Sequence, residues 1–388
     1  MIVLKKLSDF WRKCPMATIY LCIGTMKTGT TALQSFMRNN PGPLKNQGFC
    51  YPFMDVDVNN RNGHFLIYQS QQNDPQKKEQ ENIQVRQAGF AKLQGLSKKY
   101  QNIVLSEELI WHHFEKHKDF WPNLVEDLKK IDCQLKVIVY LRRQDQLIQS
   151  LWNQGVKNGM RIARTFEDYI RQERYSYFPL DYHSQLKKIE KDIGKENLYI
   201  RVYEKGQYEG EAHTIVSDLM HVLGLEMTDD LSQGDATKNP SLSGNFIEMK
   251  RIINGLPEYR KTPNFAEKPM LSANGYRLKH SEVPKHSLFS FEDQLKFLDR
   301  YEESNRKVAQ EFLGRADGIL FRDPVKEQPI YEVDPDTIYE DILTFMTEMF
   351  CLQEKRIAQL EAAIEKKSAS LFITLAKKLR NLLRTHLQ

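Results

Sequence analysis

Short apolar runs alternate with longer amphipathic stretches along most of the chain. The apolar runs do not alternate with polar residues, so each predicts a strand that is buried on both faces. The predicted strands cover residues 18–23, 48–51, 102–105, 136–141 and 197–202. The predicted helices include 32–39, 80–99, 124–130, 144–157, 212–223, 243–254 and 291–313. Strands separated by helices predict an α/β fold, in which helices flank a central parallel sheet of four or five strands.

Two stretches lack this periodicity. Residues 54–79 are polar and rich in Asn and Gln, and residues 257–290 contain four prolines. We predict that both stretches are irregular and that the second is a long loop. Because long loops in compact domains are often functional, we expect both to shape a binding site.

Near the C-terminus, apolar residues recur at alternating spacings of three and four, which is typical of a coiled coil. Seven of the nine positions with this spacing are apolar: Leu343, Met346, Phe350, Gln353, Ile357, Leu360, Ile364, Lys367 and Leu371. Residues 371–387 then combine a leucine-rich face with basic residues that have no acidic neighbours. Such a helix can pack on its own domain, pair in a homodimer or lie on an anionic membrane. We expect a homodimer through 343–371 and a peripheral membrane contact through 371–387.

The chain divides into three predicted parts. Residues 1–16 form a short amphipathic segment that is apolar and basic. Residues 17–329 form the α/β domain, and residues 330–388 form a helical extension.

Composition and charge narrow the classes of function. Of the 388 residues, 40% are hydrophobic and 28% are charged, which is ordinary for a soluble globular protein. No apolar run reaches the roughly 20 residues of a membrane span, and no secretory signal is evident. The net charge of +5 resides in residues 353–388, so the rest of the chain is neutral and nucleic acid is not expected as a ligand. The five cysteines are scattered and have no zinc-binding spacing, which predicts reduced thiols and a cytoplasmic protein. If the C-terminal segment binds a membrane, the protein would be peripheral on its inner face.

A loop rich in glycine and threonine joins the strand at 18–23 to the helix at 32–39. Its sequence from Gly24 to Thr31 is GTMKTGTT. Glycines let a backbone bend around an anion, so that successive N–H groups and a helix N-terminus point at it. A nucleotide-binding P-loop has Lys directly after its second Gly, but here Thr30 follows Gly29 and the lysine is Lys27. The loop is therefore either a phosphate-like anion site of unusual form or a plain strand–helix turn.

A second stretch favours the anion site. Arg142 follows the strand at 136–141, and Ser150 comes eight residues later on the next helix. Ligands of open α/β sheets bind at the carboxyl ends of the strands, where a guanidinium and a hydroxyl suit a second phosphate. Arg143 can join this site or pair with Asp145, and the sequence does not separate these two roles.

Together these stretches resemble the sulfotransferases that use 3′-phosphoadenosine 5′-phosphosulfate (PAPS), above all the bacterial enzymes that modify carbohydrates or capsular polysaccharides. In that family a K-[ST]-G-[ST]-[ST] loop binds the 5′-phosphosulfate, and a strand-end Arg with a Ser eight residues later binds the 3′-phosphate. The resemblance covers about residues 17–325 and implies a P-loop-like sulfotransferase fold. The residues that it implies for cofactor binding are Lys27, Thr28, Gly29, Thr30, Thr31, Arg142 and Ser150.

The resemblance implies in-line transfer of a sulfuryl group from PAPS to a hydroxyl of a saccharide acceptor, with release of 3′-phosphoadenosine 5′-phosphate (PAP) and without a metal. Lys27 would neutralise charge on the leaving phosphate. The family places a Glu or His base just after a strand on this face, so Glu108 is the first candidate and His64 the second. Strand alternation brings only one of Glu107 and Glu108 into the cleft. The structural alternative is that both carboxylates begin the next helix.

Two other functions stay open at this stage. A nucleotide-dependent kinase would explain the P-loop-like spacing, although no Lys follows Gly29 and no acidic metal-binding strand end is evident. A non-catalytic scaffold could keep the nucleotide fold and associate through its tail. His112, His113 and His117 are close in sequence, but a solvated helix face explains them better than a metal site.

Overall fold

The computed structural model describes residues 16–58, 60–228, 230–232, 241–282 and 286–385. The chain forms two compact units. The first unit comprises Met1–Leu151, Phe166–Asn239 and Phe289–Gln328, and the second comprises Trp152–Thr165, Pro240–Leu288 and Pro329–Gln388. Apart from Met16, the predicted N-terminal segment lies outside the described residues. The predicted division of the chain at residues 16 and 329 stays a prediction.

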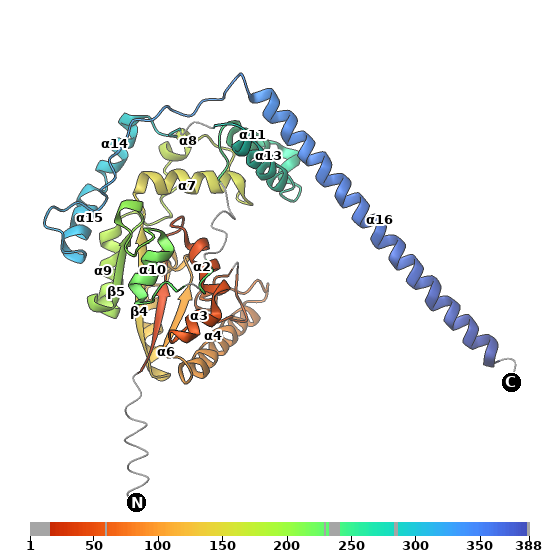
Figure 1. Ribbon diagram of the computed structural model, residues 1–388, viewed down its shortest axis with the longest axis horizontal. Helices are drawn as coiled ribbons and strands as arrows, with labels where there is room; N and C mark the ends of the chain where they lie inside the picture. The colour runs from red at the N-terminus through yellow and green to blue at the C-terminus, as the bar shows by residue number, and fades with distance from the viewer. Residues whose placement is uncertain (1–15, 59, 229, 233–240, 283–285, 386–388) are drawn as a thin grey trace, which may run out of the picture. The chain divides into compact units, whose positions relative to one another are not determined.

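The first unit contains a five-stranded parallel sheet, which confirms the predicted α/β fold (Figure 1). Its strands are β1 (Ala17–Cys22), β2 (Phe49–Cys50), β3 (Asn102–Ser106), β4 (Cys133–Leu141) and β5 (Leu198–Val202). Their order in the sheet is β2-β3-β1-β4-β5, so β1 lies at the centre between β3 and β4. The chain order reverses at β1, and at such a point the loops after neighbouring strands diverge and leave a crevice.

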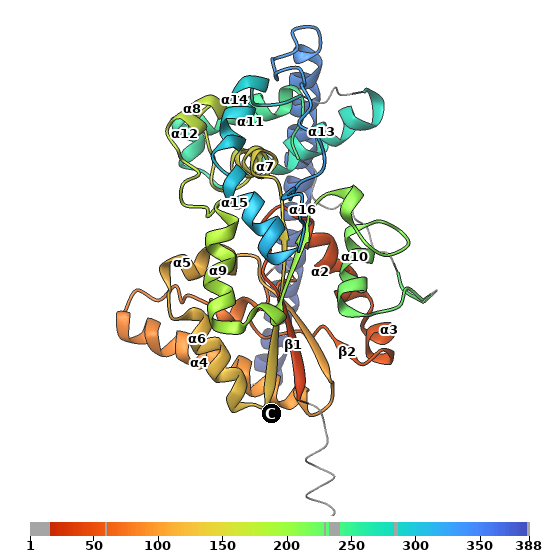
Figure 2. The same cartoon turned by 90° about the vertical axis from the view of Figure 1, so that its left-hand side faces the viewer.

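Helices cover both faces of this sheet (Figure 2). One face packs against α2 (Thr30–Asn39), α3 (Pro41–Asn46) and α10 (Ile215–Leu223) through a single cluster of buried apolar side chains. The other face packs against α6 (Phe120–Lys130) and α9 (Tyr182–Ile193). Because both faces are covered, the strands are apolar at nearly every position, which is the pattern that made them visible in the sequence.

The first unit has further helices around the sheet. They are α4 (Pro75–Ser97), α5 (Ile110–Lys116), the start of α7 (Gln144–Lys157), α8 (Phe166–Arg171), α14 (Phe291–Asp299), α15 (Glu302–Lys307), the 3-10 turns η1 (His64–Leu66), η2 (Lys195–Asn197) and η3 (Lys205–Gln207), and the π-helical turn η4 (Val308–Phe312). The sequence interpretation missed α8 and α9. The signal for α9 was present, because Tyr182, Leu186, Ile189 and Ile193 follow a four-three-four spacing and are all buried.

The second unit is helical and contains α11 (Asn245–Gly255), α12 (Pro257–Arg260), α13 (Glu267–His280) and α16 (Ile338–Thr385). The expected long loop at 257–290 is wrong, since α12 and α13 lie within it. Pro257 and Pro269 fall in the first turns of these helices, where a missing N–H breaks no helical hydrogen bond. Within the described ranges, no helix combines the length and the apolar character needed to cross a bilayer.

Candidate active site

The loop between β1 and α2 continues the pairing of β1 with β4 past the end of the strand. The Thr25 amide donates to the Tyr140 carbonyl at 2.8 Å, and the Tyr140 amide donates to the Gly24 carbonyl at 2.6 Å. The loop then turns through left-handed backbone at Lys27 (φ 64°) and Gly29 (φ 72°). This conformation is uncommon for a residue with a side chain, and such residues gather at ligand-binding sites.

Helix α2 begins directly after this turn, with Gly29 as its N-cap. Helix geometry leaves the first-turn amides of Thr30 and Thr31 without intrahelical acceptors, and no acidic residue stands in that turn. Two threonine side chains of this loop have hydrogen-bond partners within the protein. The Thr28 hydroxyl is buried and donates to the Thr25 carbonyl at 2.6 Å, and the Thr30 hydroxyl donates to the Glu108 carboxylate. In this run of threonines, the backbone amides at the start of α2 and the exposed side chain of Thr31 are the groups that could contact an anion.

Arg142 lies at the carboxyl end of β4 and reaches the same loop. Its Nη1 donates to the Lys27 carbonyl at 2.8 Å, and its guanidinium lies 5.5 Å from the ring centroid of Tyr203. The buried Nε has no hydrogen-bond partner among the described residues. Burial lowers the pKa of Arg142, but a guanidinium stays charged at any physiological pH. A buried guanidinium donor without an acceptor costs free energy, and an anion bound at Nε would remove this cost. The residues present therefore fit a bound phosphate.

Ser150 and Arg143, the two other residues of interest in this stretch, differ in their contacts. Ser150 lies in the second turn of α7, is half-buried, and its hydroxyl makes no hydrogen bond within the described part of the chain. Arg143 is buried and forms an ion pair with Asp145, whose carboxylate accepts from Nε at 2.8 Å and Nη2 at 3.1 Å. Arg143 also donates to the Asp323 carbonyl at 2.7 Å. The role of Arg143 that the sequence left open is therefore structural.

The two glutamates after β3 diverge, as strand alternation predicts. Glu107 is fully buried, and its carboxylate contacts Arg61 Nη1 at 2.7 Å and His64 Nδ1 at 2.8 Å. It also accepts from the amide of Leu109, the N-cap residue of α5, at 3.1 Å. Glu108 instead meets the Thr30 hydroxyl of the anion loop. Burial raises the pKa of Glu108, and the Thr30 hydroxyl and the charges of Arg61 and Lys27 oppose this shift.

His64 is fixed by the backbone before it, which lies along the end of β3. Asn62 is buried, donates to the Val104 carbonyl at 3.1 Å and accepts from the Ser106 amide at 2.8 Å. The Gly63 amide donates to the Ser106 carbonyl at 3.1 Å, and a Cβ at Gly63 would stand 3.0 Å from the Glu107 Cβ. No specific sequence signal marks Arg61, because a single Arg in a polar segment is unremarkable.

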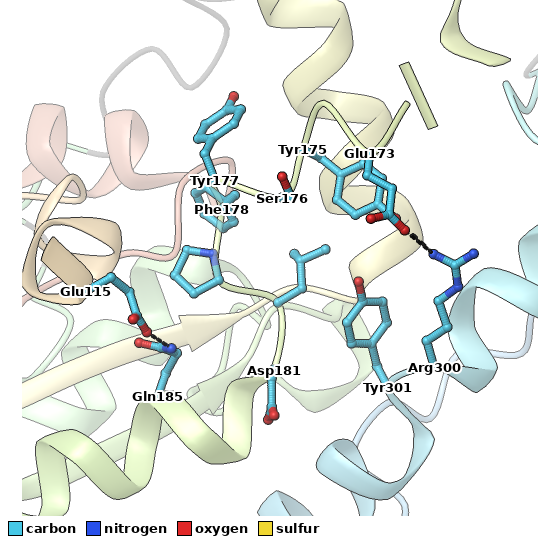
Figure 3. Close-up of a pocket in the computed structure, with 12 residues that line it drawn as sticks. Glu115, Glu173, Tyr175, Ser176, Tyr177, Phe178, Asp181, Gln185, Arg300 and Tyr301 are labelled. Atoms are coloured by element: carbon cyan, nitrogen blue, oxygen red, sulfur yellow. Dashed lines mark hydrogen bonds and ion pairs between the residues drawn. The ribbon is translucent and has the colours of Figure 1, made fainter. Parts of the chain in front are cut away.

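A pocket of about 560 Å³ opens in the first unit at the N-terminus of α9 (Figure 3). It is lined by residues 175–181 and by Glu115, Glu173, Gln185, Arg300 and Tyr301. Because α9 leads back to the start of β5, its N-terminus lies at the carboxyl edge of the sheet. The Tyr182 hydroxyl in its first turn donates to the Arg142 carbonyl at 2.5 Å. The pocket is therefore on the same edge of the sheet as the anion loop.

The three histidines near α5 form no metal site. The rings of His113 and His117 stack with centroids 4.1 Å apart, and His112 lies against Phe178. Among the residues that the structure describes, no group of three or more His, Cys, Asp or Glu side chains could hold a metal ion.

Comparisons with known proteins give distant likenesses. No family model matches the chain. An uncharacterized protein from Archaeoglobus fulgidus is 25% identical over 232 residues, which cover 57% of this chain and 60% of that protein. Among solved structures, a sulfotransferase from Alicyclobacillus acidocaldarius has a TM-score of 0.38 at 13% identity, covering 70% of this chain and 97% of that one. A retinol dehydratase in complex with androsterone and inactive cofactor PAP has a TM-score of 0.33 at 14% identity, covering 83% and 87%. At this distance the likenesses assign no activity, so the function is argued from the site's own residues.

Proposed function

We propose that this protein is a PAPS-dependent sulfotransferase that acts on a hydroxyl of a saccharide. One observation supports the proposal: the half-buried Arg142, whose buried Nε has no hydrogen-bond partner among the described residues, donates at 2.8 Å to the carbonyl of Lys27, a residue with left-handed backbone in the loop before α2. This arrangement places two anion-binding features side by side. A donor with both a 5′-phosphosulfate and a 3′-phosphate would satisfy both, whereas a nucleoside diphosphate such as ADP lacks the 3′-phosphate.

Each of the two features would bind a different part of the donor. The amides at the start of α2 and the Lys27 ammonium would hold the 5′-phosphosulfate, because a helix N-terminus and a cation both favour negative charge. Arg142 and Ser150 would hold the 3′-phosphate through a forked guanidinium and a hydroxyl. When bound, PAPS supplies the sulfuryl group and PAP is the leaving product. Lys27 would stabilise the negative charge that develops on the leaving phosphate.

Glu108 is the residue that we assign as the general base. It contacts the anion loop through Thr30, and burial raises its pKa toward the range in which a carboxylate accepts protons effectively. Its carboxylate would take the proton of the acceptor hydroxyl as the acceptor oxygen bonds to sulfur. His64 is the alternative base, since the buried Glu107 holds its Nδ1 and leaves Nε2 as the proton acceptor.

The pocket beside α9 is a suitable place for the acceptor. Its size lies within the range of roughly 300–1,000 Å³ for small-ligand sites. Its rings, which come from Tyr175, Tyr177, Phe178 and Tyr301, offer flat apolar faces to the C–H side of a sugar. Its carboxylates and Arg300 can hydrogen-bond to hydroxyls. These features support a saccharide over a purely apolar acceptor.

Calorimetric titration with PAP and with ADP tests the donor. We expect the full chain to bind PAP at least about tenfold more tightly than ADP, because a charged hydrogen-bonded contact contributes roughly 1.5–3 kcal/mol. The Lys27→Ala/Arg142→Ala variant should lose PAP binding, and Arg171→Ala, which removes an exposed ion pair on α8, should keep it. Equal affinity for PAP and ADP in the wild type would overturn the proposal and favour a kinase or a scaffold.

A further inference from the structure

Helix α16 has an apolar face that its own unit leaves uncovered. The first turns of α16 pack against α13 and α11, where Asp341 contacts Arg277 Nε at 2.7 Å and Asn245 Nδ2 at 2.9 Å (Figure 1). Phe345, one turn later, is buried. From residue 350 to 368, every residue is exposed. An isolated helix of this length in water lacks the packing that normally stabilises helices, so a covering surface is expected.

The covered and uncovered faces lie on opposite sides of α16. In a heptad numbered so that Leu343 is position a, the residues that face α13, Asp341 and Phe345, occupy positions f and c. The apolar residues with three-four spacing occupy a and d, and they include Leu343 at 65% exposure and Phe350 at 54%. At 100° per residue, positions c and f point away from a and d. The unit therefore binds the helix through positions c and f and leaves the a/d seam exposed from Leu343 to Lys367.

The residue types at the a and d positions (the seam) indicate how many helices pair and in which orientation. Ile357 and Ile364 occupy position a, and Leu360 occupies position d. β-branched residues at a with Leu at d favour a two-stranded parallel coiled coil. All three side chains are about half-exposed or more, at 48%, 63% and 47% respectively.

The charged residues at positions e and g, which flank the seam, favour a parallel orientation. Arg356 stands at position g and Glu361 at position e, five residues later. In a parallel pair, g of one helix meets e of the next heptad on the other helix, so two Arg356–Glu361 attractions form by symmetry. In an antiparallel pair, e meets e, which would oppose Glu354 and Glu361 of the two chains.

We infer that residues 343–367 of α16 form a parallel, in-register coiled coil with a second copy of this chain. The occupant of the seam is the same segment of that copy, as the Arg356–Glu361 pairing and the isoleucines at the a positions 357 and 364 both indicate. This inference concerns assembly and does not depend on the proposed activity.

Charge exchange in the full chain tests the pairing by light scattering and sedimentation. The wild type should have the mass of two chains. Arg356→Glu and Glu361→Arg should each weaken the dimer about tenfold, since each replaces two attractions with two repulsions. The combined Arg356→Glu/Glu361→Arg variant should restore the wild-type dissociation constant. Lys355→Glu, which makes the same change of charge at the outward position f, is the matched control and should have no effect.

Cross-linking tests the orientation. In a chain with Cys14→Ser and Cys351→Ser, an Ile364→Cys variant should form an intermolecular disulfide on mild oxidation, because residues at a meet their own copies only in a parallel pair in register. In an antiparallel pair over the same segment, residue 364 lies opposite the region of residue 346 and would not cross-link. A monomeric wild type would overturn the inference. A dimer whose dissociation constant is unchanged by the charge exchange, and which forms no disulfide at residue 364, would also overturn it. A wild type that is monomeric but binds anionic vesicles would assign α16 to a membrane surface instead.

Discussion

The guanidinium of Arg142 donates to the main-chain carbonyl of Lys27 at 2.8 Å. These residues belong to two stretches that are more than a hundred positions apart in the sequence, and only the two stretches together favoured an anion site. The contact makes them one site, since Arg142 supports the left-handed turn at Lys27 while keeping its Nε for another acceptor. The proposed donor site therefore requires the several donors of the planar guanidinium as well as its charge.

The first prediction follows from this fork. Arg142→Lys keeps the positive charge but cannot donate both to the Lys27 carbonyl and to a phosphate in the same plane. We expect PAP affinity to fall at least about tenfold and ADP affinity to fall less. Titration calorimetry measures both. As a control, Arg143→Lys should lower the free energy of unfolding through its buried pair with Asp145 and leave the PAP:ADP affinity ratio unchanged. The same ratio in Arg142→Lys as in the wild type would contradict the assignment.

The second prediction concerns the ionisation of Glu108. A general base works in its ionised form, so kcat/KM should rise with pH through the raised pKa of Glu108, above the usual glutamate value of about 4.3. Over the same range PAP affinity should fall, because the ionised carboxylate beside Thr30 repels an anion in the loop. Both trends should disappear in Glu108→Gln.

Separate readouts make this prediction decisive. Turnover is followed with a saccharide acceptor that supports it, and PAP affinity is followed by calorimetry in matched buffers, where ionisation of PAP itself is common to both proteins. His64→Gln is the companion variant. If the pH dependence of kcat/KM survives in Glu108→Gln and disappears in His64→Gln, then His64 is the base and Glu108 is not.

The third prediction concerns Glu107, which holds both Arg61 and His64 from a fully buried position. Glu107→Ala removes the acceptor of Arg61, His64 and the Leu109 amide and should lower the free energy of unfolding by about 3–5 kcal/mol. Glu107→Gln keeps the size and one acceptor oxygen, so the loss should be smaller. Urea unfolding of both variants measures this order. A Glu107→Ala variant as stable as the wild type would show that the buried pair contributes nothing.

The sheet was predictable because its strands are buried on both faces and are therefore apolar at successive positions, as in Val137 to Leu141. The anion loop was predictable because its glycines and its lysine occur between a strand and a helix. The helix α13 was not predicted, because Pro269 looked like a helix breaker, and only its place in the first turn makes it harmless. Local sequence shows a proline but not the position at which its helix begins.

The finer parts of the site depend on long-range contacts. The contrast between Glu107 and Glu108 follows from alternation, but which of the two would be buried depends on Arg61 and His64, more than forty positions away. Likewise, the sequence does not show that the Thr28 hydroxyl donates to the Thr25 carbonyl or that the Thr30 hydroxyl donates to the Glu108 carboxylate. Side-chain partners of this kind are set by tertiary packing and leave no periodic signal in the sequence.

The last prediction uses His113, which packs against His117 and Phe120 near α5. Burial, with help from the neighbouring charges of His117 and His112, lowers the pKa of His113 from 6.5 to about 4. Between these two pH values the unfolded chain binds a proton at this residue and the folded chain does not. The free energy of unfolding should therefore fall as the pH is lowered from about 6.5 toward about 4.

His113→Gln should lose less stability over that pH range, measured as the shift in urea midpoint between pH 7 and pH 5. His280→Gln, at an exposed position on α13, should follow the wild type, and an identical shift in His113→Gln would show that this histidine does not carry the acid sensitivity.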